Sequence, residues 1–327
     1  IKRVPAATYR SQKRGGRGVT GQTLKDEDFV EGVFSASTHE YILFFTNMGR
    51  VHRRKGYQIP EGGRVAKGTN IVNILPLEAG EKVTAGLTVR EFDEDNLLFV
   101  TKQGTVKRVT LESLNTARKA GIRALTLADG DELIAVMKTN GSQNIVLATA
   151  DGMAICFSEN DVRVMGRDAA GVRGIALSDG DYVVGAGIAE EGKQLLTVTE
   201  LGYGKRTEIA EYMRLGENGQ RSPQLRGGKG LKNYNLTAKT GRVAGVAVVG
   251  EDDDVMLIES GGVLIRMAAS DINIYKRDTQ GVILMRLEEG SRVISLEPVA
   301  REDSAEDTAE AFPDEAPAEA PAETEEP

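Results

Sequence analysis

The chain has 327 residues, 40% of them hydrophobic, and a formal net charge of −8 at pH 7. With one cysteine it cannot form an internal disulfide, and no apolar run reaches the roughly 18 residues of a membrane-spanning helix. The charge is unevenly distributed, because residues 301–327 hold 11 acidic residues and one basic residue, whereas residues 1–300 hold 38 acidic and 40 basic residues. The acidic overall charge therefore does not exclude a polyanionic partner for the body of the chain.

The first distinctive segment is a basic, glycine-rich heptapeptide near the start of the chain. It consists of Gln12, Lys13, Arg14, Gly15, Gly16, Arg17 and Gly18. A variant lies at 224–230, where Arg226 and Lys229 supply the cations. Since glycine has no Cβ, backbone N–H groups in such a turn can approach an anion closely, and Arg and Lys add charge-assisted hydrogen bonds to phosphate. The heptapeptides predict contact with phosphate groups, with a solvated glycine-rich turn as the alternative.

Short aliphatic runs that lead into a Thr-x-x-Gly turn recur along the chain. The turns lie at 46–49, 101–104, 149–152 and 199–202, with a weaker fifth copy at 259–262. Each is flanked by residues that favour strands, and glycine can adopt the positive φ that a tight turn needs. These segments predict five β-hairpins. A short helical turn is expected within 205–215.

A glycine just before an apolar strand marks a repeat, and we call it the anchor glycine. The anchor glycines are Gly18, Gly68, Gly121, Gly171, Gly230 and Gly281, at intervals of 50, 53, 50, 59 and 51 residues. A period near 50 residues with about four short strands per unit is typical of propeller blades. The sequence predicts an all-β fold, a six-bladed β-propeller-like domain of four-stranded blades over residues 1–300. Because there are six anchors but five hairpins, residues 2–9 are expected to supply a strand that joins the two ends. A β-solenoid is the competing architecture.

Pairs of basic residues recur on the outgoing strand of several hairpins. They are Arg53 and Arg54, Lys107 and Arg108, and Lys205 and Arg206. In a ring these cations would fall at one radius and form a basic track along the rim, and ordinary polar strand ends are the alternative. A duplex presents one charge per roughly 1.7 Å of its axis. Aromatic residues are only 5% of the chain and Trp is absent, which favours double-stranded over single-stranded DNA as the partner.

From residue 301 onward the chain is dominated by Ala, Glu, Asp and Pro. Such a segment cannot bury enough apolar surface to offset the entropy of ordering, so 301–327 is predicted to be a disordered acidic tail. Its acidic residues could compete with DNA for the basic surface, and an inert, solubilising end is the alternative. The candidate regulatory residues are Glu302, Asp303, Glu306 and Asp307.

No catalytic or metal-binding constellation emerges from the sequence. His39 and His52 are the only histidines and lack metal-ligand spacing, and Cys156 lies in an apolar run. No nucleophile, base or metal set can be assembled, so we expect a noncatalytic chain without a cofactor.

The heptapeptide, its place in the repeat and the repeat itself resemble the C-terminal domain of the DNA gyrase A subunit. The family motif reads Gln-Arg-Arg-Gly-Gly-Lys-Gly; in this chain Lys13 and Arg17 preserve the charge, whereas Leu225 replaces a cation in the second copy. The resemblance implies a six-bladed β-pinwheel that bends duplex DNA and wraps it around its rim with positive handedness. It also implies that residues 12–18 help to close the pinwheel and bind DNA there.

The resemblance further implies a part of an ATP-dependent type II topoisomerase that introduces negative supercoils. The implied partners are double-stranded DNA, the N-terminal region of gyrase A and the B subunit, with ATP and Mg²⁺ used outside this chain. The implied location is the bacterial cytoplasm, in association with the chromosome. Two alternatives remain: the C-terminal domain of topoisomerase IV, which lacks an intact heptapeptide, and a propeller that scaffolds other proteins.

Overall fold

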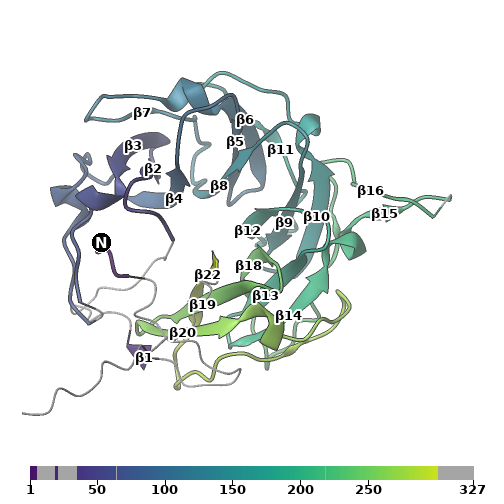
Figure 1. The fold of residues 1–327 in the computed structure, drawn as a ribbon. Helices are drawn as coiled ribbons and strands as arrows, with labels where there is room; N and C mark the ends of the chain where they lie inside the picture. Colours follow the sequence, from purple (N-terminus) through teal and green to yellow (C-terminus); the bar gives the residue numbers. More distant parts are fainter. Residues whose placement is uncertain (6–18, 21–34, 64, 218, 301–327) are drawn as a thin grey trace, which may run out of the picture.

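The chain forms small antiparallel β-sheets arranged around a ring (Figure 1). This computed structural model describes residues 1–5, 19–20, 35–63, 65–217 and 219–300. The helical segments in these ranges are 3₁₀ turns of three or four residues, and none could cross a membrane. The turns are η2 (Gly56–Gln58), η3 (Ile71–Asn73), η4 (Leu111–Leu114), η5 (Glu159–Asp161), η6 (Ile209–Tyr212) and η7 (Ala269–Asp271).

The described strands build five four-stranded sheets, which we number I to V in chain order and describe from the innermost strand outward. Sheet I contains β4 (Val83–Val89), β2 (Tyr41–Thr46), β3 (Arg50–Lys55) and β7 (Ile122–Arg123). Sheet II contains β8 (Leu133–Thr139), β5 (Asn96–Thr101), β6 (Thr105–Thr110) and β11 (Val172–Arg173). Sheet III contains β12 (Val183–Ile188), β9 (Asn144–Thr149), β10 (Met153–Ser158) and β17 (Leu231–Lys232). Sheet IV contains β18 (Val243–Val249), β13 (Gln194–Thr199), β14 (Tyr203–Glu208) and β21 (Val282–Ile283). Sheet V contains β22 (Val293–Ala300), β19 (Asp253–Glu259), β20 (Val263–Ala268) and β1 (Val19–Thr20).

All five predicted hairpins are confirmed, and the structure explains their Thr-x-x-Gly motif. In sheet II the Gly104 amide donates to the carbonyl oxygen of Thr101 at 2.9 Å, and Gly104 has a φ of 80°. The hydroxyl of Thr101 accepts the amide of Thr105 at 3.1 Å, which closes the turn a second time. In the weaker fifth copy the carboxylate of Glu259 replaces the hydroxyl and accepts the amide of Val263 at 3.0 Å.

A tight turn glycine gives a test of this geometry. Gly202 has a φ of 80°, and a Cβ built on it would overlap the carbonyl oxygen of Met285. Gly202→Ala is therefore expected to lower the free energy of unfolding by about 2–4 kcal/mol, from backbone strain together with the clash. Gly130→Ala is the matched control, because Gly130 has a φ of 72° but an open surrounding, and it should lose only about 1 kcal/mol. Equal losses in urea unfolding would show that the clash contributes nothing.

The outermost strand of sheets I to IV is supplied by the unit that follows in the sequence, whereas that of sheet V is β1, from the N-terminal end of the chain. After hairpin β9–β10 of sheet III, for example, the chain runs back to sheet II, forms β11 there against β6, and returns as β12. The anchor glycine allows the two backbones to approach closely. Gly171 has a φ of 93°, and a Cβ built on it would lie only 2.6 Å from the carbonyl oxygen of Val106, so a larger residue would clash there. Successive sheets are thus interlocked.

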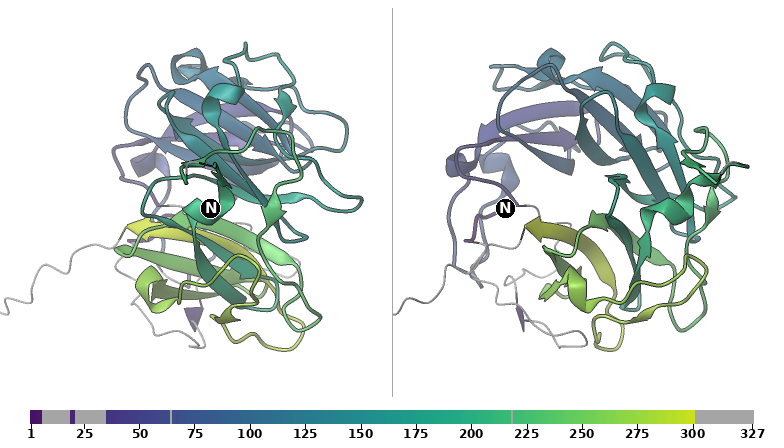
Figure 2. Two further views of the ribbon diagram at one scale, coloured as in Figure 1. Left: turned by 90° about the vertical axis from the view of Figure 1, so that its right-hand side faces the viewer. Right: turned by 45° about the vertical axis from the view of Figure 1, so that its right-hand side comes forward.

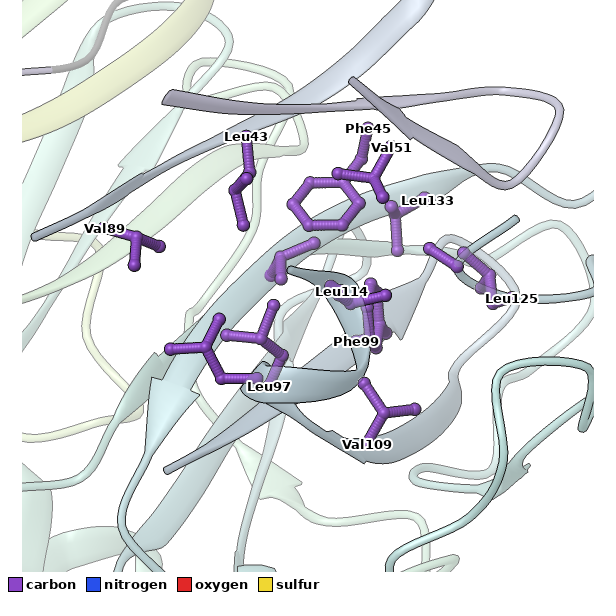
Figure 3. Packing of buried hydrophobic residues seen from close by; sticks show 13 residues of the cluster. Leu43, Phe45, Val51, Val89, Leu97, Phe99, Val109, Leu114, Leu125 and Leu133 are labelled. Carbon is purple, nitrogen blue, oxygen red and sulfur yellow. The ribbon is translucent and has the colours of Figure 1, made fainter. Parts of the chain in front are cut away.

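The hydrophobic core lies between neighbouring sheets and not at the centre of the ring. Between sheets I and II, Leu43 and Phe45 face Leu97 and Phe99, all fully buried (Figure 3). The rings of Phe45 and Phe99 meet edge to face, with centroids 5.4 Å apart. Equivalent apolar layers separate sheets II and III, III and IV, and IV and V.

The first and last sheets flank the side of the ring at which the N-terminus lies (Figures 1 and 2). There Ile1 exchanges hydrogen bonds with Thr69, through Ile1 N to Thr69 O at 2.6 Å and Thr69 N to Ile1 O at 2.8 Å. Arg3 forms a parallel bridge to Glu61, as Arg206 does to Ile274 in sheet IV. Residues 1–3 therefore occupy the place of an outgoing hairpin strand at a sixth ring position.

The all-β, propeller-like prediction is confirmed, with one difference in blade number. Five four-stranded sheets are found among the described residues instead of six, since the sequence contains six anchors but five hairpins. Residues 2–9 were expected to supply the strand that joins the two ends, and residues 6–9 of this range lie outside the described residues. Residues 1–3 contact the first unit, and the strand that pairs with β20 of sheet V is Val19–Thr20 instead.

A separate two-stranded hairpin projects outward from the ring near sheet III (Figure 1). It consists of β15 (Arg214–Leu215) and β16 (Arg221–Ser222), which follow η6 directly. The helical turn predicted within 205–215 is thus limited to η6. The hairpin accounts for the longest anchor interval, 59 residues, because the other connections run from the 3₁₀ turn to the anchor without it.

Candidate nucleic-acid interface

The first heptapeptide, Gln12 to Gly18, and the acidic tail residues Glu302, Asp303, Glu306 and Asp307 lie outside the described residues. Their proposed contact with DNA stays a prediction. The interface can be built from the second heptapeptide, from its counterparts in other repeats, and from the exposed cations around them.

The second heptapeptide is held against sheets II and III by backbone hydrogen bonds. Gln224 begins it by donating its amide to the carbonyl oxygen of Cys156 at 2.7 Å. The Gly227 amide donates to Gly174 O at 2.6 Å, and Gly227 and Gly230 have φ values of 80° and 74°. The glycines therefore allow the loop to lie flat on a neighbouring strand end. Lys229 is exposed at the end of this loop.

Arg226 connects three parts of the ring. Its Nε donates to the carbonyl oxygen of Asp161 at 2.8 Å, and one terminal nitrogen donates to the carbonyl oxygen of Arg173 at 3.0 Å. Its side chain is half-buried. Arg226 thus stabilises the junction between two units and leaves only part of its guanidinium available to a phosphate.

An arginine four residues before the anchor glycine makes the same contact in other repeats. Arg167 donates to the carbonyl oxygen of Arg123 at 3.4 Å, and Arg277 donates to that of Lys232 at 3.2 Å. In each case the acceptor lies on the outermost strand of the preceding sheet. The sequence contains a signal for this contact that the motif analysis missed, since Arg14 and Arg64 precede their anchors by the same four residues.

The predicted exposed track on the outgoing strands is wrong for four of its residues. Lys107, Arg108, Lys205 and Arg206 are all buried, at 8% exposure or less. Their strands pack against the next unit, whose polar groups take up the charges. Arg108 pairs with Glu159 at 3.0 Å, and Arg206 donates to the carbonyl oxygen of Ile272 at 2.7 Å.

Arg53 and Arg54 are half-buried and also have protein partners. Arg53 donates to Asn115 at 2.8 Å, and its guanidinium carbon lies 4.8 Å from the ring centroid of Tyr41. Arg54 donates to the carbonyl oxygen of Ile74 at 2.9 Å. Both residues connect β3 to adjacent segments, and they are secondary candidates for a DNA contact.

The buried lysines fasten the loops that precede the anchor glycines. Lys205 Nζ donates to the carbonyl oxygens of Lys276 at 2.7 Å and Arg277 at 2.6 Å, and to Thr279 Oγ1 at 3.2 Å. Lys107 likewise contacts the carbonyl oxygen of Arg167. At the sixth ring position, Lys2 Nζ donates to the carbonyl oxygens of Gly63 and Ala66, both at 3.0 Å. These lysines position the loops, including their arginines.

Burial lowers the pKa of Lys205 from 10.5 to about 7 and that of Lys107 to about 8. Between about pH 7 and about pH 10 the unfolded chain then binds more protons at Lys205 than the folded chain, so the free energy of unfolding rises with pH. Lys205→Met should remove up to roughly 1.4 kcal/mol per pH unit from this slope in urea unfolding between about pH 7 and about pH 9. The exposed Lys239, changed to Met, is the control and should keep the slope. A wild-type slope in both variants would contradict the pKa shift.

Exposed cations occupy one position on the outermost strands of three successive sheets. Arg123 ends β7, Arg173 ends β11 and Lys232 ends β17, and all three are exposed. We call them the edge cations. Each follows its anchor glycine by two residues, a spacing that could have identified them. In sheet IV, Ile283 takes this position.

The edge cations are exposed on the outermost strands of their sheets. The innermost strands β4, β8, β12, β18 and β22 contact one another in sequence, so the opposite edge of each sheet forms the outside. A regular series of positive charges on the outside of a ring can follow the phosphates of a curved duplex. Within the described ranges no three His, Cys, Asp or Glu side chains gather as a metal site.

Comparison with known proteins identifies one family. A family profile described as "DNA gyrase C-terminal domain, beta-propeller" matches residues 1–37, 40–90, 95–140, 143–190, 193–220, 222–250 and 253–300. The DNA gyrase A subunit of Staphylococcus epidermidis is 44% identical over 307 residues, covering 93% of this chain and 33% of that protein. The DNA gyrase A subunit of Escherichia coli K12 is 42% identical over 308 residues, covering 93% and 34%. The chain spans about a third of the length of these curated relatives.

Solved structures with the same architecture are also found. The structure of a DNA gyrase A C-terminal domain superposes with a TM-score of 0.80 at 26% sequence identity, covering 91% of this chain and 95% of that chain. A DNA topoisomerase IV C-terminal domain gives a TM-score of 0.69 at 25% identity, covering 91% and 90%.

Proposed function

Because this chain belongs to the DNA gyrase C-terminal domain family, we propose that it binds duplex DNA on the outside of the ring and bends it there. The observation that carries this proposal is the series of edge cations, Arg123, Arg173 and Lys232, at one position of three successive sheets. Phosphate contacts distributed over several units can offset a bending cost on the order of 1–6 kcal/mol for 20–30 base pairs.

The described residues offer no helix for the major groove, so the contacts would be mainly to the DNA backbone. Phosphate contacts position a protein without reading the sequence, and preference among sequences would come from how easily the DNA bends. The first heptapeptide would add Lys13, Arg14 and Arg17 next to β1, the strand that pairs with the last sheet.

We propose a noncatalytic role for this chain within a larger type II topoisomerase. Its partners would be double-stranded DNA, the remainder of the gyrase A subunit and the B subunit. ATP and Mg²⁺ would act on those other parts, in the bacterial cytoplasm and in association with the chromosome. Wrapping with positive handedness would present a neighbouring DNA segment for passage and so favour negative supercoiling. The share of the relatives that this chain covers, about a third, supports this division of roles.

The topoisomerase IV alternative receives less support than gyrase. That fold is similar, but the relatives described above are gyrase A subunits, and the heptapeptide at Gln12 to Gly18 keeps its cations. A scaffolding propeller would leave the regular edge cations without a role.

The test is topological. A nicked plasmid is sealed by ligase in the presence of the chain, and the change in linking number is measured at low salt. A positive change supports chiral wrapping, and no change at a salt concentration where the chain binds would refute it. A second sample lacks residues 301–327, and a larger change there would assign the acidic tail a competing role.

A further inference from the structure

The hairpin β15–β16 is an addition to one unit of an otherwise regular ring. Its ladder pairs Arg214 with Ser222 and Leu215 with Arg221, and the turn is closed by Gly216 N to Gln220 O at 2.8 Å. Figure 1 shows it projecting beyond the outer edge of sheet III. It is not needed to complete any of the five sheets, and its strands contribute to none of the buried apolar clusters.

The base of the hairpin is held firmly although its strands are short. A two-stranded hairpin is marginal by itself in water. Here the Arg221 guanidinium donates to the carbonyl oxygen of Ala210, and Gln224 Nε2 donates to that of Tyr212 at 2.9 Å. Tyr212 is fully buried, so the hairpin has a fixed root and a defined direction.

The surface of the hairpin combines cations with an exposed leucine. Arg214 and Arg221 are exposed, and Leu215 is 68% exposed. Because alternate residues of a strand face opposite sides, Leu215 and its partner Arg221 lie on one face, and Arg214 and Ser222 on the other. Glu217, in the loop, is the one acidic residue described between β15 and β16.

The hairpin stands beside other exposed cations of the rim. It leads directly into the second heptapeptide, whose loop ends at Lys229 and continues into β17 with Lys232. The five basic residues of this region, Arg214, Arg221, Arg226, Lys229 and Lys232, outnumber the acidic Glu211 and Glu217 among the described residues. The local charge therefore fits a polyanion.

We propose that β15–β16 is an accessory DNA-binding arm that holds the duplex where it passes sheet III. Because Leu215 and Arg221 share one face of the hairpin, Leu215 would enter the minor groove while Arg221 contacts a phosphate on the same side, and Arg214, on the opposite face, would contact the phosphates of the other strand across the groove. Apolar side chains inserted in this way unstack a base step and favour a bend, whereas arginines attract the backbone. This inference rests on the proposed function and adds a site to it.

The first test separates the charges from the leucine in the full 327-residue chain. Arg214→Gln with Arg221→Gln should lower the slope of log affinity against log salt by about 1.8 and weaken binding to duplex DNA about 60-fold at 0.1 M salt. Leu215→Ala should keep the salt slope but reduce the linking-number change of a ligated plasmid by about half. Glu217→Gln, on the same hairpin, is the matched control and should not weaken binding.

The second test removes the arm. Replacing residues 214–222 by Gly-Gly restores an anchor interval within the range of the other repeats, 50 to 53 residues. The thermal midpoint should be unchanged, and the DNA affinity should fall as in the double Gln variant. If all of these variants keep the affinity, the salt slope and the linking-number change of the wild-type chain, the proposal of a DNA-binding arm is refuted and the proposed function stands. If the wild-type chain itself does not bind or wrap DNA, the proposed function fails and the arm fails with it.

Discussion

Replacing the three edge cations together by Ala is expected to weaken binding to duplex DNA on the order of 500-fold at 0.1 M salt. Each phosphate contact contributes about 0.9 to the slope of log affinity against log salt, so losing Arg123, Arg173 and Lys232 should lower the slope by about 2.7. All three side chains are exposed, and the arginines of the following loops bind the backbone carbonyl oxygens of these residues, which the substitutions keep. The side-chain bond that is lost, from Lys232 Nζ to Asn235 Oδ1 at 3.1 Å, is exposed. The substitutions should therefore leave the thermal midpoint unchanged.

Two controls make this result specific to the outer edge. Arg123→Lys, Arg173→Lys and Lys232→Arg together conserve the charges and should keep most of the slope. Lys82→Ala with Arg90→Ala removes exposed charge at the ends of β4, the innermost strand of sheet I, and should change the slope little. If both sets of Ala variants lower the slope of log affinity against log salt by the same amount per charge, the DNA responds to the overall electrostatic field of the domain and does not bind specifically along its outer edge.

Changing Arg14 and Arg17 to Ala is expected to abolish the positive linking-number change while reducing affinity far less. These residues immediately precede β1, whose residues Val19 and Thr20 pair with β20 at the other end of the ring. A DNA contact made by residues 12–18 would decide whether bound DNA continues from the last unit to the first. The plasmid ligation assay measures this directly, and affinity is measured in parallel on linear DNA.

The second heptapeptide supplies the control for this prediction. Arg226→Ala with Lys229→Ala removes the same number of cations from a loop that joins sheets II and III in the middle of the series. We expect this variant to lower the linking change without abolishing it. Equal losses at both heptapeptides would mean that the wrap depends on total charge, and the special role of residues 12–18 would be withdrawn.

The sequence could reveal the hairpins because their turns depend on local chemistry. A glycine with positive φ and a threonine hydroxyl close four of the five turns, as Thr101 and Gly104 do in sheet II, and a glutamate takes the place of the threonine in the fifth. The repeat and the family also followed from the sequence, because the anchor glycines recur where a strand must approach another backbone closely. The pairing of the outer strands with the preceding sheet could not be predicted from the sequence, because a strand of two residues such as β11 is too short to show a periodic pattern.

The prediction that the cations of the outgoing strands form a basic track along the rim was wrong for a physical reason. Lysine on a strand is usually exposed, but Lys107 and Lys205 are buried because their ammonium groups bind carbonyl oxygens of the following unit. In sheet III the residue at the position of Lys107 and Lys205 is the buried Ile155. An apolar residue at this position of one repeat indicates, from the sequence alone, that the position is buried. The exposed cations lie instead on the outermost strands, whose pairing is known only from the structure.

The return of each outer strand also determines how the domain would respond to mechanical load. Tension in a curved duplex would act on the edge cations, and each of these lies on a strand that belongs to one unit by sequence but to the preceding sheet by pairing. A pull on Arg173, for example, would be carried by the β11–β6 ladder and by the covalent chain into β12 at the same time. Neighbouring units would therefore share the force, and two units could separate only if the ladder between the outer strand and the preceding sheet broke.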